Sequence, residues 1–219
     1  MMWRWLADRR WYGSIPTLTA AAMVTHTIGL GMLVATPNFR HPAVLAKDLV
    51  SVDDIAGGRL ICGLGAGAPG YDAKVLGGTP LRPRERADRF DVFVELLDAV
   101  LVRGDVDATS PWYTASGVAF HPRAGNGPRL PFAVAATGPR GMALTARFGQ
   151  YWITSGPPAD FGMRQLREVM PVLREQMHRV DAACEHAGRD PATLRRLFVA
   201  DAAVGRDHQV AGRLRGRRR

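Results

Sequence analysis

Residues 28–67 constrain the fold of this chain most, because two short apolar runs flank one amphipathic segment. The first run is Ile28–Val34 and the second is Arg59–Leu64, and both have the length of strands rather than helices. Between them, Pro42–Ile55 carries polar residues at helical spacing among Ala, Leu and Val. Gly57-Gly58 follows, and glycine is typical of helix C-termini. The stretch therefore predicts a strand, a helix and a second strand, the repeating unit of α/β folds.

The same alternation continues along the chain. Further helices are predicted over residues 16–25, from Pro83 to about residue 101, over 137–148 and over about 160–187; further strands are predicted over 130–136, 150–154 and 194–199. Residues 103–130 contain Gly and Pro and predict a surface excursion or a short hairpin. About five strands fit either an open doubly wound sheet or an incomplete (β/α) barrel, since a complete barrel has eight.

Length and composition describe one ordinary globular domain. The chain has 219 residues, of which 47% are hydrophobic and 22% charged. It contains no apolar run of the ~18 residues that a membrane span needs, and the N-terminus lacks a secretory signal pattern, so we expect a cytoplasmic protein that does not enter a membrane. Cys62 and Cys184 are far apart, which fits a reducing compartment and excludes a disulfide framework or a structural zinc site.

The net charge of +9 does not indicate nucleic-acid binding. In the last fourteen residues six arginines oppose one aspartate, so +5 of the +9 comes from that end. The rest of the chain shows no basic helix face interleaved with aromatic residues. We therefore expect a small-molecule substrate and no nucleic acid. Residues 1–199 are predicted to form a single partial barrel domain, followed by an Arg-rich tail at 200–219 outside it.

Two loops that follow predicted strands are candidates for ligand binding. Gly63-Leu-Gly-Ala-Gly67 allows a ring or phosphate to approach the backbone, or forms a tight turn only, and it lacks the spacing of a dinucleotide fingerprint. Thr137-Gly-Pro-Arg-Gly141 places free N–H groups at a helix start, where an anion binds well, unless Thr137 merely caps the helix. The sequence shows no group of residues typical of a nucleophile, a metal site or acid/base catalysis. A lone histidine such as His41 is more often structural than catalytic. We therefore assign no catalytic residue and no metal site, and expect a cofactor to supply the chemistry.

The motifs together resemble the bacterial luciferase-like monooxygenases over about residues 12–190. The matching segments, in order, are Ile28–Gly31, Pro37–Lys47, Asp53–Leu60, Gly63–Gly67, Glu85–Phe90 and Ala135–Trp152. The resemblance implies a TIM-type (β/α) barrel and an oxidoreductase that uses FMN or the 5-deazaflavin coenzyme F-420, two cofactors that the sequence does not distinguish. Relatives are commonly dimeric, which leaves a homodimer open.

The resemblance also implies a cofactor site. A bulge with a non-prolyl cis peptide is expected near Leu33-Val34, with Thr36 beside it. The loop Gly65-Ala66-Gly67 and Tyr71 would line the cofactor. Ala136, Thr137, Gly138 and Arg140 would hold its phosphate end through backbone N–H groups. The resemblance does not predict the substrate, because the loops that determine substrate specificity vary within the family.

Two departures from the family pattern lead to further expectations. The first one or two β/α units and the last unit have no counterpart in this sequence, so the alternative to an enzyme is a truncated barrel fragment without catalysis and with little or no cofactor binding. In the sugar-phosphate dehydrogenases of the deazaflavin branch an acidic residue follows the Gly-x-Gly loop. Ala68 stands at that position here, so that particular activity is not expected.

Overall fold

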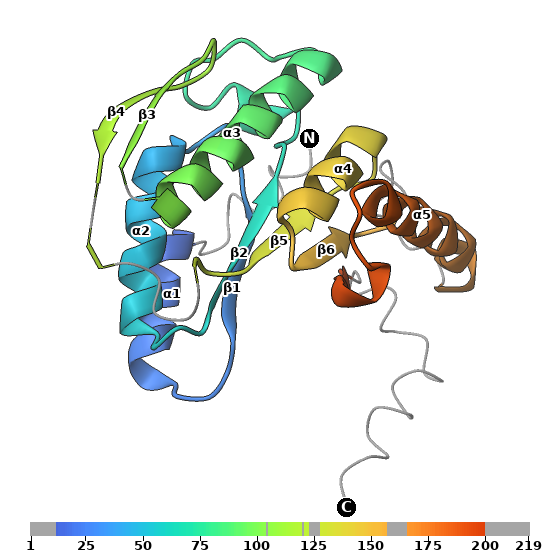
Figure 1. Cartoon of the computed structure of the whole chain (residues 1–219), viewed down its shortest axis with the longest axis horizontal. Coiled ribbons are helices and arrows are strands. Elements are labelled where there is room, and N and C mark those ends of the chain that lie inside the picture. Colours follow the sequence, from blue (N-terminus) through green and yellow to red (C-terminus); the bar gives the residue numbers. More distant parts are fainter. Residues whose placement is uncertain (1–11, 104, 120, 123–127, 157–165, 200–219) are drawn as a thin grey trace, which may run out of the picture. The chain divides into compact units, whose positions relative to one another are not determined.

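The computed structural model describes residues 12–103, 105–119, 121–122, 128–156 and 166–199. The chain divides into two compact units, Met1–Ala135 and Ala136–Arg219, which we describe separately (Figure 1). The predicted Arg-rich tail at 200–219 lies outside the described residues. The prediction of a single domain over 1–199 stays a prediction.

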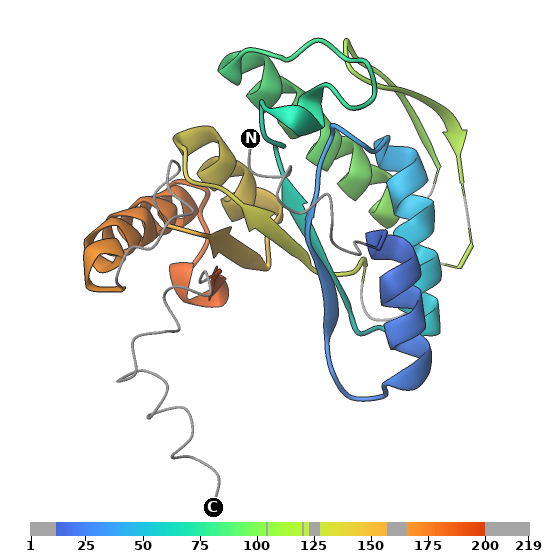
Figure 2. The same ribbon diagram turned by 180° about the vertical axis from the view of Figure 1, so that it is seen from behind.

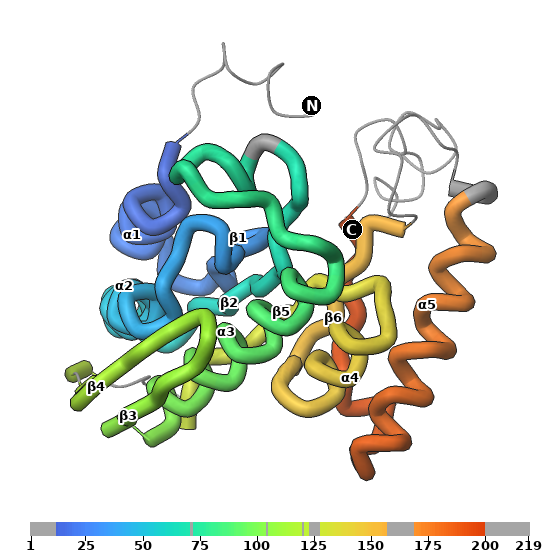
Figure 3. Tube along the Cα trace, turned by 90° about the horizontal axis from the view of Figure 1, so that it is seen from above, coloured from blue at the N-terminus to red at the C-terminus, as the bar shows by residue number. Residues whose placement is uncertain are grey.

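The first unit alternates strands and helices and ends in a strand that follows a hairpin. Its elements are α1 (Ser14–Val24), β1 (Leu30–Ala35), α2 (Pro42–Ile55), β2 (Leu60–Gly65), a 3₁₀ turn (Tyr71–Ala73), α3 (Pro83–Arg103), β3 (Val106–Thr109), β4 (Thr114–Val118) and β5 (Phe132–Ala135). The parallel order is β1-β2-β5, while β3 and β4 form a separate antiparallel hairpin. Seen from above, α1 and α2 lie outside the parallel strands β1 and β2 (Figure 3).

Buried aliphatic and aromatic side chains hold these layers together. They come from α2, β2, α3 and β5, and include Leu45, Leu49, Leu60, Leu64, Phe93, Leu97 and Phe132, each with no exposed surface. The view from behind shows α1 beside α2 on one side of β1 (Figure 2). Burial at this spacing explains why the sequence pattern located the helices correctly.

The amino ends of β1 and β2 are fixed by Arg59 and Asp53. The Arg59 guanidinium donates to the carbonyls of Ala22 and Thr25 at the end of α1, at 3.3 and 2.8 Å. It also donates to the carbonyl of Ile28 at 2.7 Å, and its Nε donates to that of Ala56 at 2.6 Å. Buried Asp53 accepts a 3.0 Å bond from the Leu60 amide. These contacts stabilise the fold at the strand ends away from the glycine loop.

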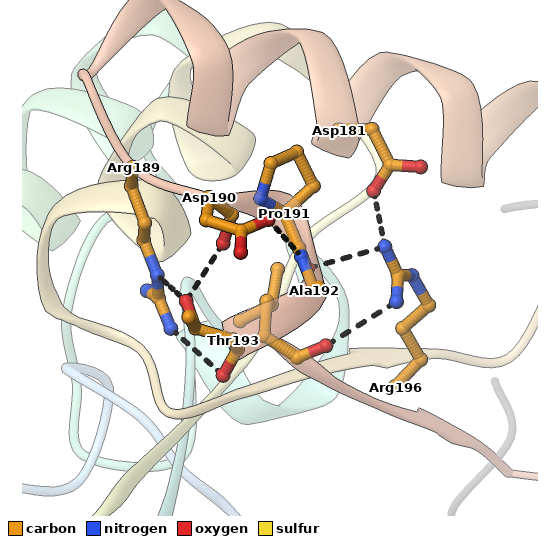
Figure 4. Close-up of polar contacts among 8 residues, drawn as sticks. Asp181, Arg189, Asp190, Pro191, Ala192, Thr193 and Arg196 are labelled. Atoms are coloured by element: carbon orange, nitrogen blue, oxygen red, sulfur yellow. Dashed lines mark hydrogen bonds and ion pairs between the residues drawn. The ribbon is translucent and has the colours of Figure 1, made fainter.

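The second unit contains α4 (Pro139–Phe148), β6 (Tyr151–Thr154), α5 (Leu166–His186), a 3₁₀ turn (Pro191–Thr193) and β7 (Arg195–Phe198). Strands β6 and β7 pair in parallel and α4 packs on α5. The Arg189 guanidinium donates to the carbonyls of Ala146 and Gly149 at the end of α4. Asp181 of α5 accepts a hydrogen bond from Arg196 of β7 (Figure 4). The Arg189 contacts fix the connection after α5, and the Asp181–Arg196 pair joins α5 directly to β7.

The described elements agree with the sequence prediction. The five predicted strands are β1, β2, β5, β6 and β7, and the short hairpin considered for residues 103–130 is β3–β4. The predicted start of the long helix near residue 160 falls outside the described residues. The fold is α/β with parallel strands, as expected for part of a TIM-type barrel. None of the described helices is long and apolar enough to span a membrane.

Candidate functional site

Strand β1 is irregular at its carboxyl end, where the resemblance places the cofactor. The peptide bond between Leu33 and Val34 is cis, and the register with β2 shifts between Met32 and Ala35. This confirms the expected bulge and cis bond. The Leu33 side chain is 66% exposed although it belongs to a strand of the core sheet. Thr36 follows, and its hydroxyl oxygen is buried with no hydrogen-bond partner among the described residues. This end of β1 thus offers one apolar surface and one unused polar atom.

The glycines of β2 are required by the close approach of β1. A Cβ on Gly63 would lie 1.9 Å from the Met32 carbonyl oxygen, and a Cβ on Gly65 would lie 2.6 Å from Val34 Cγ2. Neither the ligand interpretation nor the tight-turn interpretation anticipated this reason for the two glycines. Gly67 differs, because its φ of +80° is one that other residues rarely adopt. Ala66, between Gly65 and Gly67, is half-buried.

Asn38 links the loop after β1 to the loop after β2. Its Nδ2 donates to the Ala68 carbonyl at 3.2 Å, and its Oδ1 accepts a hydrogen bond from Arg89 Nη2 of α3. A Cβ on Gly67 would lie 2.7 Å from Asn38 Nδ2, so that glycine makes room for the amide. The two loops and the first turns of α3 are therefore held as one structure.

A pocket of about 100 Å³, partly open to solvent, lies beside this link. It is lined by Asn38, Ala68, Pro69, Ala73, Leu76, Gly78, Thr79, Leu81, Arg86 and Arg89. Two lining residues are arginines, and none of the lining residues in the described part of the chain is acidic. Burial lowers the pKa of Arg89, and neighbouring Arg86 lowers it further while Tyr113 acts in the opposite direction. An anion in the pocket would offset this repulsion.

Sequence reasoning did not single out Arg86 and Arg89 as site residues, although both lie in the family-like segment Glu85–Phe90. Arg89 precedes Phe93 by four residues and Arg86 precedes it by seven, so both continue the apolar stripe of α3 towards its N-terminus. A cation in line with the apolar stripe at the start of a helix was the sequence feature that could have indicated a binding residue.

In the second unit, the segment after β5 is arranged as an open helix start. Gly138 is the N-cap of α4 and makes no side-chain cap, and Pro139 occupies the first turn. The alternative that Thr137 caps this helix is therefore wrong. Gly138 and Arg140 are exposed, which leaves this turn accessible to an anion. Ala136 is buried, and its carbonyl accepts a 2.7 Å bond from Trp152 Nε1.

The remaining sequence candidates have structural positions. His41 caps α2, since its Nδ1 accepts a 3.2 Å bond from the Ala43 amide, which supports the structural interpretation. Tyr71 begins the 3₁₀ turn, and its side chain lies outside the described part, so its role stays a prediction. The described residues contain no cluster of His, Cys, Asp or Glu suited to a metal ion.

Known proteins resemble this chain over most of its length. 4-Hydroxyprotoasukamycin monooxygenase of Streptomyces nodosus subsp. asukaensis is 32% identical over 173 residues, which are 77% of this chain and 44% of that protein. F-420-dependent glucose-6-phosphate dehydrogenase of Beutenbergia cavernae is 32% identical over 74% of this chain and 47% of that protein. The chain thus spans about half the length of these curated relatives.

Solved structures agree on the fold. A riboflavin lyase crystallised with modified FMN and riboflavin superposes with a TM-score of 0.73 at 18% identity, covering 88% of this chain and 45% of that one. A family model described as luciferase-like monooxygenase matches residues 4–218. The sequence motifs, the bulged β1 and the glycine-bearing β2 all occur within that match. This chain therefore belongs to the luciferase-like monooxygenase family.

Proposed function

We propose that this chain is part of an oxidoreductase that uses FMN or coenzyme F-420 and acts on a small organic substrate. The family match and the names of the similar proteins support the reaction class, since these proteins are monooxygenases and F-420-dependent enzymes. The observation that carries the proposal for this chain is the pocket beside Asn38. It places the cations Arg86 and Arg89 next to the carboxyl ends of β1 and β2.

The residues fit such a cofactor in two respects. Both cofactors combine a flat ring with a phosphate group. Exposed Leu33 supplies an apolar surface for a ring, and the buried Thr36 hydroxyl has an unused hydrogen-bonding capacity nearby in the chain. Arg86 and Arg89 supply positive charge for an anionic group. When bound, the cofactor would carry electrons to or from the substrate, while the protein binds it, orients it and excludes water.

The sequence also predicts Ala136, Thr137, Gly138 and Arg140 as a phosphate-binding segment, and this proposal belongs to the second unit. Its support is the N-terminus of α4, whose N-cap Gly138 makes no side-chain cap, because a helix N-terminus attracts anions. Gly65, Ala66, Gly67 and Tyr71 remain proposed cofactor neighbours. The two anion sites are tested separately: phosphate titrated against the ¹⁵N-labelled protein should shift the Gly138 and Arg140 amides if the α4 site is used.

Ala68 bears on the choice of substrate. It lines the pocket, and its carbonyl accepts a hydrogen bond from Asn38. Because the residue is alanine, no acidic side chain faces the pocket from this position. We therefore do not propose the sugar-phosphate dehydrogenase activity of the relative from Beutenbergia cavernae. A cytoplasmic location and a homodimer remain proposals. Sedimentation of the purified chain tests the dimer.

Cofactor titration tests the proposed function. We expect FMN or F-420 to bind the chain in a fluorescence titration, and Arg89→Gln to weaken that binding by about tenfold or more because an ion-paired hydrogen bond is lost. Arg84→Gln is the matched control: Arg84 is an exposed arginine of the same helix that does not line the pocket. We expect it to change affinity by less than about twofold.

Two results would contradict the proposal. Failure of both cofactors to bind would favour the alternative of a non-catalytic barrel fragment, which also predicts a broad thermal transition without cooperativity. Equal losses from Arg84→Gln and Arg89→Gln would show that net charge, rather than the pocket, attracts the anion.

A further inference from the structure

Tyr113 is buried at the tip of the β3–β4 hairpin. A tight turn sets its position: Ser110 Oγ accepts hydrogen bonds from the amides of Trp112 and Tyr113 at 3.3 and 2.9 Å. The same hydroxyl donates to the Tyr113 carbonyl at 2.9 Å. Only 9% of Tyr113 is exposed, although the strands on either side are largely exposed. The hairpin therefore inserts one aromatic side chain into the first unit.

The ring of Tyr113 is held between the loop after β1 and helix α3. It meets the His41 ring edge-on, with centroids 5.3 Å apart, and the Phe93 ring at 5.9 Å. Phe93 lies four residues after Arg89, so the two side chains occupy one face of α3 in successive turns. The ring contact with Phe93 thus places the phenol beside the turn of α3 that carries the pocket arginine.

Two polar atoms between the hairpin and α3 lack hydrogen-bond partners among the described residues and could bond to each other. The Tyr113 hydroxyl and the Arg89 Nε are both buried, and neither has a hydrogen-bond partner among the described residues. A buried polar group without a hydrogen-bond partner destabilises a fold and is rare. Two such groups side by side therefore suggest that they gain a partner in another state of the protein, such as the ligand-bound one. Nε is a donor and the hydroxyl oxygen is an acceptor. The Arg89 Nη2 already donates to Asn38 at the pocket wall.

We propose that Tyr113 is a positioning residue for Arg89: its hydroxyl accepts the Arg89 Nε hydrogen bond when an anion occupies the pocket, and so holds the guanidinium towards that anion. This rests on the proposed function of the pocket as the place of an anionic cofactor group. His41 and Phe93 fix the ring, and the hairpin thereby contributes to a site that its own strands do not line.

The chemistry of the hydroxyl suits this role. Burial raises the pKa of Tyr113 to about 12, against which the charge of Arg89 acts only in part. The phenol is therefore neutral near pH 7, and it orients Arg89 without cancelling its charge. A carboxylate in the same place would form an ion pair and compete with the incoming anion.

A double-mutant cycle tests the proposal. Tyr113→Phe keeps the ring and removes only the hydroxyl. We expect it to weaken binding of FMN, and of inorganic phosphate as a simpler probe, by about tenfold without lowering Tm. The same change made in Arg89→Gln protein should have no further effect. Tyr151→Phe is the matched control, since Tyr151 Oη also contacts an arginine, Arg195, at 3.0 Å outside the pocket.

The outcomes separate this proposal from the proposed function. If wild-type protein binds FMN and Tyr113→Phe binds it equally well, Tyr113 does not position Arg89, whereas the pocket remains the cofactor site. If FMN, F-420 and phosphate all fail to bind the wild type, the proposed function is overturned and this one with it. Exchange of the Arg89 Nε proton, followed by ¹⁵N NMR, gives a second readout: saturating phosphate should slow it in wild type and not in Tyr113→Phe, and equal rates in the two proteins would overturn the contact.

Discussion

Gly63 lies so close to Met32 that a Cβ on the glycine would come within 1.9 Å of the Met32 carbonyl oxygen. The oxygen belongs to the backbone, so no side-chain rotation relieves the contact. Gly63→Ala should therefore destabilise the fold by about 3 kcal/mol or more, at the upper end of overpacking effects. Urea unfolding measures this. Gly70→Ala is the control, because a Cβ there meets nothing within 4 Å; equal stabilities of the two variants would refute the argument.

Removing Arg59 should destabilise the first unit without weakening cofactor binding. Its guanidinium satisfies carbonyls at the end of α1 and after α2, which Arg59→Ala would leave without these partners. We expect a loss of roughly 3 kcal/mol in the free energy of unfolding. Affinity for FMN, measured where the variant is still folded, should be unchanged, because Arg59 does not line the pocket. A selective loss of affinity at full stability would contradict this.

Gln176 is predicted to be the least replaceable polar side chain of α5. It is 2% exposed, accepts a 2.6 Å bond from the Thr154 hydroxyl and donates a 3.1 Å bond to the Gly156 carbonyl. Gln176→Leu removes both, and should lower the free energy of unfolding by about 2–3 kcal/mol because the Gly156 carbonyl loses its bond from Gln176. Chemical denaturation checks the value. Glu175→Leu, at a neighbouring exposed position, should change it little.

Tyr113 should make the fold sensitive to alkaline pH. Its folded pKa is about 12, above the unfolded value near 10, because burial disfavours the phenolate. Titration of Tyr113 therefore leaves the free energy of unfolding unchanged below pH 10 and lowers it as pH rises from 10 towards 12. The difference in unfolding free energy between wild type and Tyr113→Phe should shift against wild type across that window. A constant difference would show that Tyr113 titrates normally.

The sequence was most informative where local chemistry marks both ends of an element. Helix α2 has the predicted bounds, Pro42–Ile55, because proline starts the helix and Gly57 ends it in a positive-φ conformation. The register shift of β1 came only from the resemblance, since no local pattern encodes it. The true constraint on Gly63 could not be predicted either, because it depends on the position of a neighbouring strand.

The candidate site was predicted less well than the fold. Arg86 and Arg89 were not predicted as site residues, although their spacing to Phe93 places them on the line of the apolar stripe. Tyr113 lies in a segment without period, so nothing local indicated that it is buried beside Phe93. A helix start within Thr137–Gly141 was predicted correctly, but the sequence left open whether Thr137 caps it, and only the structure identifies Gly138 as the N-cap. Side chains whose role depends on distant partners required the structure.

The close contact between β1 and β2 has a consequence for engineering this chain. Val34 Cγ2 and the Met32 carbonyl oxygen occupy the space that side chains at 65 and 63 would fill. A larger residue at 65 therefore requires a smaller one at 34, whereas no substitution on β1 relieves the contact at 63, because it is made by a backbone oxygen. Libraries that aim to reshape this end of the strands should vary the two strands together, because variants selected on one strand alone will mostly be lost to misfolding before their specificity is assayed.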